Sequence, residues 1–529
     1  MLSIKHLLSL IVLVAVSLSV TTSCTDDLST TPLDDDVQTT ETVYTSQKNY
    51  RQVLAKLYAG FATTGQQGPA GDADIQGIDE GFSSYVRMYW VAQELPTDEA
   101  VVGWTDPGLP QYNYQDWTAS NDFVMGLYSR IFYQISLANE FIRNAQDSDN
   151  EQIQQYLAEA RFLRALFYWH ALDLYGGNVP FVTEDDDVGA YQPEPTNSDS
   201  LFAYIESELK AVTDKLPAPQ QNEYGRADRA AAWTVLAKLY LNAETYIGEP
   251  HWDEVVTYTK NIIDEGGYTL EDNYQHLFLA DNHTADGVIF AVPFDGDNIQ
   301  TYGGTNFIVH AQVGGNMSGT EDYGIDGGWE GHRVTPQFVN LFDADSDGEY
   351  EENDGRALFF TDGQNKEIED VTNFNDGYAM TKWKNITSGG EPGKRQAFVD
   401  TDFPMFRLAD IYLMYAEAVV RGGQGGSETE AVNLINDLRE RAYGDDSGNI
   451  TSGQLTLDFI LQERARELSW EGHRRTDLIR YDLFTSGDYV WAWKGETQEG
   501  AATDEIYRIY PLPASDVNSN TNLEQNPGY

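Results

Sequence analysis

Residues 151–180 read EQIQQYLAEARFLRALFYWHALDLYGGNVP. Between Ile153 and Leu174, apolar residues recur at three- and four-residue steps, which is the spacing of one face of an α-helix. Gly176 and Gly177 then interrupt the pattern, and a proline follows shortly after them. The stretch predicts one long helix with an abrupt C-terminal end, so the protein should be built mainly from helices.

Two pairs of shorter helices are predicted further along the chain. The first pair covers residues 227–242 and 252–264, and the second covers residues 408–420 and 428–442, each with glycines at the turn or just beyond it. Small residues on one helix facing large residues on the next are typical of tetratricopeptide (TPR) pairs. The match to that consensus is partial, so we describe these as TPR-like pairs.

The composition changes between residues 280 and 405, where Gly, Asn, Asp and Tyr are frequent. The apolar runs there are short, namely 288–292 and 307–309, so we expect long loops with a few short strands. Ordered loops on a helical scaffold often carry function. We therefore predict a mainly α protein with a loop-rich insertion, divided into a signal (1–23), a flexible tether (24–45) and one fold with helical, loop-rich and helical parts (46–279, 280–405 and 406–529).

The charge of the chain excludes several functions. Its 529 residues carry 85 Asp+Glu against 33 Lys+Arg, a formal net charge of -52. Phosphate backbones are bound by Lys and Arg, so nucleic acid is excluded as a partner, and adhesion to an anionic membrane surface by charge is also excluded. The chain is nevertheless 41% hydrophobic and 12% aromatic, which is enough to form packed cores.

The N-terminus predicts export and lipid attachment. A short basic start, an apolar run from Leu7 to Val20 and small residues precede Cys24, the only cysteine in the chain. This pattern resembles a bacterial lipoprotein signal, with Cys24 as the lipid attachment site. The acidic residues after Cys24 resemble the export signal of surface-exposed lipoproteins of Bacteroidetes. The alternatives are an ordinary secretory peptide and a tether compatible with either leaflet.

Several enzyme motifs are absent from the sequence. It contains no H-E-x-x-H and no G-x-S-x-G, and residues 388–395 miss the phosphate-binding loop at its first glycine and after its lysine. Pairs of carboxylates could indicate a glycosidase, but among 85 acidic residues such spacings carry no information.

One acidic segment has the spacing of a calcium loop. Acidic residues stand at its first, third, fifth, ninth and twelfth positions, and Gly348 stands at the sixth, where such a loop turns sharply. Asp343, Asp345, Asp347 and Glu351, at the first, third, fifth and ninth positions, follow the loop pattern. The twelfth position is Asp354 rather than the usual Glu. The alternative is a solvated acidic loop. The candidate ligands for a structural calcium ion are Asp343, Asp345, Asp347, Glu349 and Asp354.

Three aromatic residues stand in polar, glycine-rich surroundings. They are Trp104, Tyr302 and Trp329. An aromatic side chain next to glycines on a loop is easily exposed, and several such rings can form a stacking surface for a sugar. The alternative for each ring is to anchor its loop in a local core.

Further segments carry a resemblance to a known family. They include RFLRALFYWHALDLYG (161–176), GRADRAAAW (225–233), ELPTDE (94–99), EGHRRTD (471–477) and the closing QNPGY (525–529). With these segments the chain resembles the SusD/RagB lipoproteins over essentially the whole mature sequence. The resemblance implies a TPR-like fold, glycan capture without catalysis, and a SusC-like TonB-dependent transporter in the outer membrane as partner.

The resemblance also implies a glucan site. Tyr302 and Trp329 match stacking residues of the family, and Asp79 and Arg87 match its polar contacts. Trp104 matches one of two loop tryptophans, whereas the other falls on Val102 and a following asparagine falls at about Pro107, beside Asp106. The aromatic residues of the family's glucan site are thus present only in part. Those that are present favour a neutral glucan, of starch or another α-linked type, with a β-glucan or other neutral glycan as the alternative.

Other prominent residues are interpreted as scaffold. We expect Arg161, Arg164, Arg474 and Arg475 to form ion pairs between helices, and Trp491 and Trp493 to lie in the core. Two other functions stay open at this point: a secreted glycosidase, and a purely structural lid whose partner transporter supplies all recognition.

Overall fold

The computed structural model describes residues 40–529, apart from residues 70, 72, 187, 190, 343–349 and 351–352. Cys24 and nearly all of the predicted signal and tether therefore lie outside the described residues. The chain divides into two compact units, residues 1–50 and residues 51–529. Short helix α2 (Thr40–Val43) belongs to the first unit, and everything below concerns the second, which starts within α3 (Gln47–Ala59).

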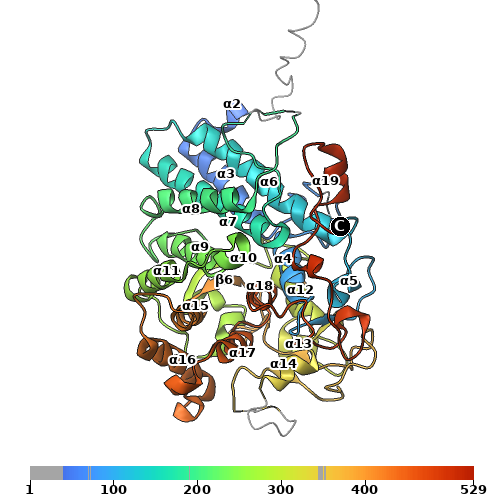
Figure 1. Ribbon diagram of the computed structural model, residues 1–529. Helices are drawn as coiled ribbons and strands as arrows, with labels where there is room; N and C mark the ends of the chain where they lie inside the picture. Colours follow the sequence, from blue (N-terminus) through green and yellow to red (C-terminus); the bar gives the residue numbers. More distant parts are fainter. Residues whose placement is uncertain are drawn as a thin grey trace, which may run out of the picture. The chain divides into compact units, whose positions relative to one another are not determined.

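Eight helices form a stack in which the first seven pack each against the next in the order of the chain, while the eighth packs against the sixth (Figure 1). They are α6 (Asp122–Ala145), α7 (Glu151–Tyr175), α8 (Ser198–Thr213), α9 (Arg229–Leu241), α11 (Trp252–Glu265), α15 (Leu408–Val420), α16 (Glu428–Tyr443) and α17 (Leu457–Leu468). The chain leaves the stack after α11 and returns at α15, which packs on α11. This arrangement confirms the predicted mainly helical scaffold.

The long helix α7 shows why the sequence folds this way. The Asn150 side chain accepts hydrogen bonds from the first free backbone N–H groups, at Gln152 and Ile153, and so caps the N-terminus. Nearly every residue from Ile153 to Tyr175 is buried, as expected for a helix surrounded by neighbours. The helix ends at Gly176, its C-cap residue, and Gly177 lies under the start of α8, where a Cβ atom would lie only 1.9 Å from the Ser198 backbone nitrogen.

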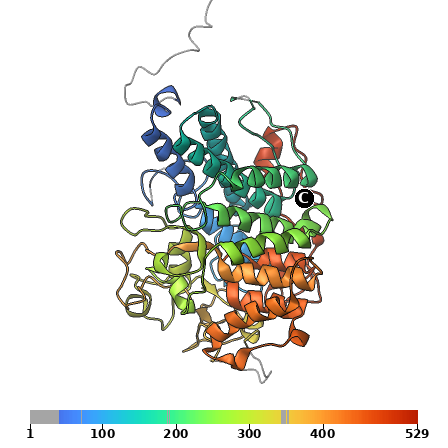
Figure 2. The same cartoon turned by 90° about the vertical axis from the view of Figure 1, so that its left-hand side faces the viewer.

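The remaining helices are shorter and connect or flank the stack. They are α4 (Tyr85–Glu94), α5 (Pro110–Tyr114), α10 (Ala243–Ile247), α12 (Gly304–Ala311), α13 (Gly319–Tyr323), α14 (Pro336–Asn340), α18 (Arg474–Arg480) and α19 (Ala514–Ser519). Figure 2 shows the helical hairpins on one side and the loop-rich segment between α11 and α15 on the other. Among the described residues, no helix has both the length and the apolar character needed to cross a membrane.

Three small antiparallel pairs of strands tie the loop-rich segment together. β1 (Val101–Val102) pairs with β3 (His332–Arg333), β2 (Val288–Val292) with β6 (Phe403–Arg407), and β4 (Phe359–Phe360) with β5 (Ala379–Met380). The run 288–292 thus forms a strand, as expected. The run 307–309 does not, because it lies within helix α12, whose residues are all buried. Three apolar residues are too few to distinguish a strand from a buried helical turn.

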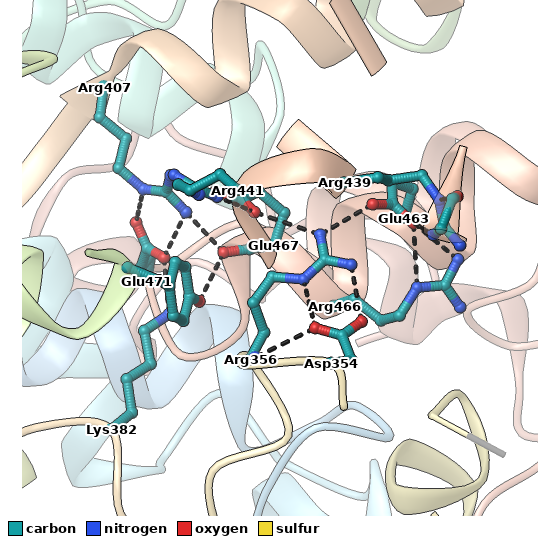
Figure 3. Close-up of polar contacts among 12 residues, drawn as sticks. Asp354, Arg356, Lys382, Arg407, Arg439, Arg441, Glu463, Arg466, Glu467 and Glu471 are labelled. Carbon is teal, nitrogen blue, oxygen red and sulfur yellow. Dashed lines mark hydrogen bonds and ion pairs between the residues drawn. The ribbon is translucent and has the colours of Figure 1, made fainter. Parts of the chain in front are cut away.

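A network of buried ion pairs joins α17 to the returning chain (Figure 3). Glu463 accepts from Arg356, Arg439 and Arg466, while Glu467 accepts from Arg356, Arg407 and Arg441. Arg407 also pairs with Glu471, which binds Lys382. These charges are buried, so removing one partner would leave another uncompensated at a cost of about 3–5 kcal/mol. The network fixes where the loop-rich segment rejoins the helical stack.

The four arginines expected to be structural are confirmed in that role. Arg161 and Arg164 both pair with Glu208 of α8, Arg474 pairs with Asp98, and Arg475 pairs with Asp173. Trp491 is buried as expected, whereas Trp493 is half-buried and packs beside a small cluster around Val101 and Ile368.

Candidate functional site

The pairing of β1 with β3 brings two of the predicted aromatic residues together. Val101 stands opposite Arg333 and Val102 opposite His332, and the Gly103 backbone N–H donates to Gly331 O at 2.8 Å. Trp104 follows β1 and Trp329 precedes β3, so their side chains meet. The Trp104 Nε1–H donates to the Trp329 backbone oxygen at 2.9 Å, and the two ring centroids lie 6.4 Å apart with a 45° angle between the planes.

Tyr302 supplies a third ring at the start of α12. It is among the most exposed large hydrophobic residues of the described chain, at 39%. Its ring packs against Phe398, with a 5.6 Å separation between ring centroids. Thr301 turns the backbone here by accepting from the Gly303 N–H, and the Gly304 N–H donates to the Ser84 hydroxyl. These bonds present the Tyr302 ring outward from a fixed backbone.

Arg87 of α4 lies between Tyr302 and Phe307, and Phe307 in turn packs against Trp104. Its Nη1 donates to the Tyr302 backbone oxygen at 3.3 Å and to Gly81 O at 3.0 Å. Its guanidinium lies over the Phe307 ring at 4.3 Å, and that ring is 6.0 Å from Trp104. Burial lowers the pKa of Arg87 to about 10, while Asp106 and Asp79 act to raise that pKa. Arg87 therefore remains charged at neutral pH.

Asp79 is exposed and lies on the loop before α4. Its Oδ1 accepts from the Gly81 N–H at 2.8 Å and the Phe82 N–H at 3.3 Å. Oδ2 has no such bond among the described contacts, and the same holds for Arg87 Nη2 and Nε. Asp79 Oδ2 and Arg87 Nη2 are thus left without a protein partner, the first able to accept hydrogen bonds and the second able to donate them.

We name the set Asp79, Arg87, Trp104, Tyr302 and Trp329 the aromatic surface. Its two tryptophans are half-buried, so each ring keeps part of its area open to solvent. Such a surface offers flat apolar area for stacking, with an acceptor and a charged donor beside it. Val102, by contrast, is buried in β1 and adds nothing to the exposed area.

Several residues around the surface were not predicted from the sequence. Phe307 lies beneath Arg87, Phe398 packs beside Tyr302, and His310 and His332 pack against the tryptophans. Of these, only His332 stands beside a glycine, Gly331, so the glycine-rich setting could have indicated only this one. Phe398 is nearly 100 residues from Tyr302, so only the folded chain reveals the contact.

The predicted calcium loop lies almost entirely outside the described residues. This applies to Asp343, Asp345, Asp347 and Glu349. Asp354 is described and buried, and both of its carboxylate oxygens accept from Arg356, at 2.9 and 2.8 Å. Across the described ranges, no group of three or more His, Cys, Asp or Glu side chains is arranged to hold a metal ion.

Comparison with known proteins agrees with this architecture. A family model described as "SusD family" matches residues 349–529, and one described as "Starch-binding associating with outer membrane" matches residues 35–241. The starch-binding protein SusD of Bacteroides thetaiotaomicron is 34% identical, with 99% of each chain covered. SusD-like protein P2 of Formosa agariphila is 26% identical, with 77% of this chain and 81% of its own length covered.

Solved structures show the same fold. The surface glycan-binding protein A from Bacteroides fluxus has a TM-score of 0.70 at 20% identity, covering 92% of this chain and 100% of its own. A SusD superfamily protein from Parabacteroides distasonis has a TM-score of 0.71 at 19% identity, with the same coverage. Taken with the 34% identity to SusD across 99% of its length, the chain belongs to the SusD/RagB family.

Proposed function

We propose that this protein is a cell-surface lipoprotein that binds a neutral glucan on its aromatic surface, without catalysis. It passes the glucan to a SusC-like TonB-dependent transporter in the outer membrane. Trp104, Trp329 and Tyr302 stack on sugar rings, while Asp79 and Arg87 bond to sugar hydroxyls. The observation that carries this proposal is the convergence of the two indoles, 6.4 Å apart, beside the guanidinium that contacts Tyr302.

The energetics suit reversible capture. At ~25 cal/mol per Å² of apolar area removed from water, a sugar face on one ring contributes about 1–2 kcal/mol. The contributions of three rings, less the cost of ordering a flexible glycan, give a dissociation constant in the roughly millimolar to micromolar range. A ligand held this weakly can be released to a transporter, and repeating units in a polymer add avidity.

The charge supports a neutral ligand. At a net charge of -52, the molecule repels anionic polysaccharides until salt screens the field beyond about 10 Å. Arg87 is the basic member of the aromatic surface, and Asp79 and Asp106 offset its charge. The surface therefore has no excess of positive charge with which to attract uronic acids or sulfated sugars.

Anchoring and partner are part of the same proposal. Lipid on Cys24 would hold the chain at the membrane, so Cys24→Ala should move the protein from the membrane fraction to the soluble fraction. Detergent extraction of the wild-type protein from its own cells should co-purify a TonB-dependent transporter. Recovery of the mutant in the membrane fraction, or of wild type alone after extraction, would contradict these two parts.

A glycan array on the isolated protein tests the ligand class. We expect binding to starch-type α-glucans or other neutral glucans, with no binding to anionic polysaccharides at low salt. Incubation with any retained polysaccharide should release no reducing ends, whereas their release would indicate a glycosidase. Failure to bind every glycan would instead support a structural lid whose partner supplies the recognition.

A further inference from the structure

The two tryptophans of the aromatic surface each pack against a buried histidine. His310 is 1% exposed, and its ring stacks on Trp329 with a 4.7 Å centroid separation and 29° between the planes. His332 is fully buried, and its ring lies 5.3 Å from Trp104 at 47°. We name His310 and His332 the histidine layer. Each of the two indoles that we assign to sugar stacking thus packs on a buried imidazole ring.

His310 holds Trp329 through both backbone and ring. It lies in the last turn of α12, where its Nδ1 is 2.9 Å from the Asn306 backbone oxygen, one helical turn earlier. That bond places the proton on Nδ1 and fixes the plane of the ring. The His310 backbone oxygen also accepts from the Trp329 N–H at 2.8 Å. The histidine therefore sets both the position of the Trp329 backbone and the plane on which its indole rests.

His332 has the equivalent place under Trp104. On its scaffold side it stacks on Trp90 at 4.8 Å, and it meets Phe307 edge-on at 4.8 Å and Trp470 at 6.2 Å. Neither ring nitrogen has a hydrogen-bond partner in the described structure. The contacts of His332 are therefore those of a flat ring, wedged between the scaffold and Trp104.

Both imidazoles are neutral at neutral pH. Burial lowers the pKa of His310, although the nearby Asp326 carboxylate acts to raise it. Burial, with Arg333 and Arg87, holds the pKa of His332 well below its usual value. Two neutral aromatic rings can stack on the indoles with no ion between them.

We propose that His310 and His332 are positioning residues that fix the angle between the Trp104 and Trp329 indoles before a glycan arrives. This inference rests on the proposed function, because it assigns a role within the same surface. A ring that is already ordered loses less side-chain freedom on binding, at about 0.5–1.5 kcal/mol per immobilised side chain. Loss of either histidine should therefore weaken glycan binding about two- to tenfold, although neither touches the ligand.

A spectroscopic signature reports the angle directly, without any ligand. Two indoles 6.4 Å apart and inclined at 45° couple and give a far-ultraviolet circular dichroism couplet. Trp90 and Trp470, 5.3 Å apart, couple as well, so the Trp104→Phe spectrum is subtracted to isolate the pair of interest. His310→Ala should reduce this difference couplet, whereas His310→Phe, which keeps a flat ring, should restore most of it.

Controls separate positioning from general destabilisation. His283→Ala removes an exposed histidine and should leave both the couplet and glycan affinity unchanged. His332→Phe keeps the buried volume and should fold even if His332→Ala does not. Affinity is measured by calorimetry with a soluble neutral glucan on each folded variant.

The outcomes are distinct. A weaker couplet and weaker binding in His310→Ala, both restored by His310→Phe, support the positioning role. An unchanged couplet in His310→Ala overturns it, as does a couplet that His310→Phe fails to restore. If wild type shows the couplet but binds no glucan, the proposed function fails while the structural role of the histidine layer still stands on the spectra.

Discussion

Gly331, which has no side chain, determines where the Trp104 ring can lie in the aromatic surface. Trp104 lies across Gly331, where a Cβ atom would come within 2.5 Å of Trp104 Cζ2 and 2.6 Å of Cε2. These are ring atoms of a residue that is also fixed by its bond to the Trp329 backbone oxygen. The close approach therefore requires glycine at this position, although the Gly331 backbone is not in the left-handed region.

We expect Gly331→Ala to displace the Trp104 ring and weaken glucan binding about tenfold or more, with little change in thermal stability. The added methyl must push the indole away from its place beside Trp329. Gly327→Ala is a matched control on the same loop, since a Cβ there meets nothing within 4 Å. Calorimetric titration of both variants checks this, and equal affinities would show that the ring position does not matter.

The glycine-rich setting predicts the exposed rings of the aromatic surface, but not the histidines that pack against them. Trp104, Tyr302 and Trp329 stand beside glycines, and the structure brings the two tryptophans together and places Tyr302 in contact with Arg87. His310 directly follows the apolar run 307–309. His332 stands next to Gly331, but its stacking partner Trp104 is more than 200 residues away and leaves no local pattern. Contacts of this kind follow from the β1–β3 pairing, which two residues per strand cannot reveal in a sequence.

The bounds of a helix can be predicted from the sequence where its apolar periodicity runs over several turns. Helix α15 has the bounds that the sequence predicts, and α11 and α16 extend one residue beyond them. Each combines several turns of apolar periodicity with a glycine at or just beyond its end. The sequence does not predict helix α12, because its apolar run spans only three residues and its burial comes from distant neighbours such as Trp90.

Two buried glutamates, Glu94 of α4 and Glu99, bind the segment that precedes α18. The Glu94 Oε1 accepts from the Gly472 and His473 N–H groups, and Glu99 accepts from the Trp470 N–H. Both carboxyl groups are buried side by side. Burial raises the pKa of Glu94 to about 7, and burial together with the nearby Glu94 carboxyl raises the pKa of Glu99 well above its usual value.

This pair should make the protein less stable as pH rises. Between the ordinary pKa of 4.5 and about 7, the folded state binds more protons than the unfolded state, so stability falls with increasing pH. Glu94→Gln keeps an acceptor for the two N–H groups but carries no charge. We expect its thermal midpoint to fall less than that of wild type between pH 5 and pH 8, by a few degrees.

Scanning calorimetry at the two pH values measures the effect. Glu244→Gln, which changes an exposed glutamate, should keep the wild-type slope. A Glu94→Gln slope equal to that of wild type would show that the pair is not protonated in the folded state.

Across the whole molecule, acidic and basic side chains differ in where they lie as well as in number. Among the residues that the structure describes, many basic side chains are buried in ion pairs or hydrogen bonds, while most acidic side chains are exposed or half-buried. The buried basic residues are Arg130, Arg164, Lys238, Arg333, Arg356, Lys382, Arg407, Arg464, Arg466, Arg474, Arg475, Arg480 and Lys494. The outer surface is thus more uniformly acidic than the totals of 85 acids and 33 bases suggest.

Salt should therefore stabilise the fold. Raising NaCl from about 0.01 M to about 0.1 M shortens the screening length from about 30 Å to about 10 Å, which weakens repulsion between surface carboxylates. Buried pairs such as Arg407 with Glu467 are screened much less. We expect the thermal midpoint to rise by several degrees across this range, and a fall would mean that attractive surface pairs dominate instead.

A paired substitution tests whether the aromatic surface captures a neutral glucan. Tyr302→Ala combined with Trp329→Ala removes two of the three rings without touching the buried ion-pair network. In native gels containing a soluble neutral glucan, wild type should be retarded and the double variant should migrate as it does without glucan. Equal retardation of the two proteins would contradict the assignment of the site.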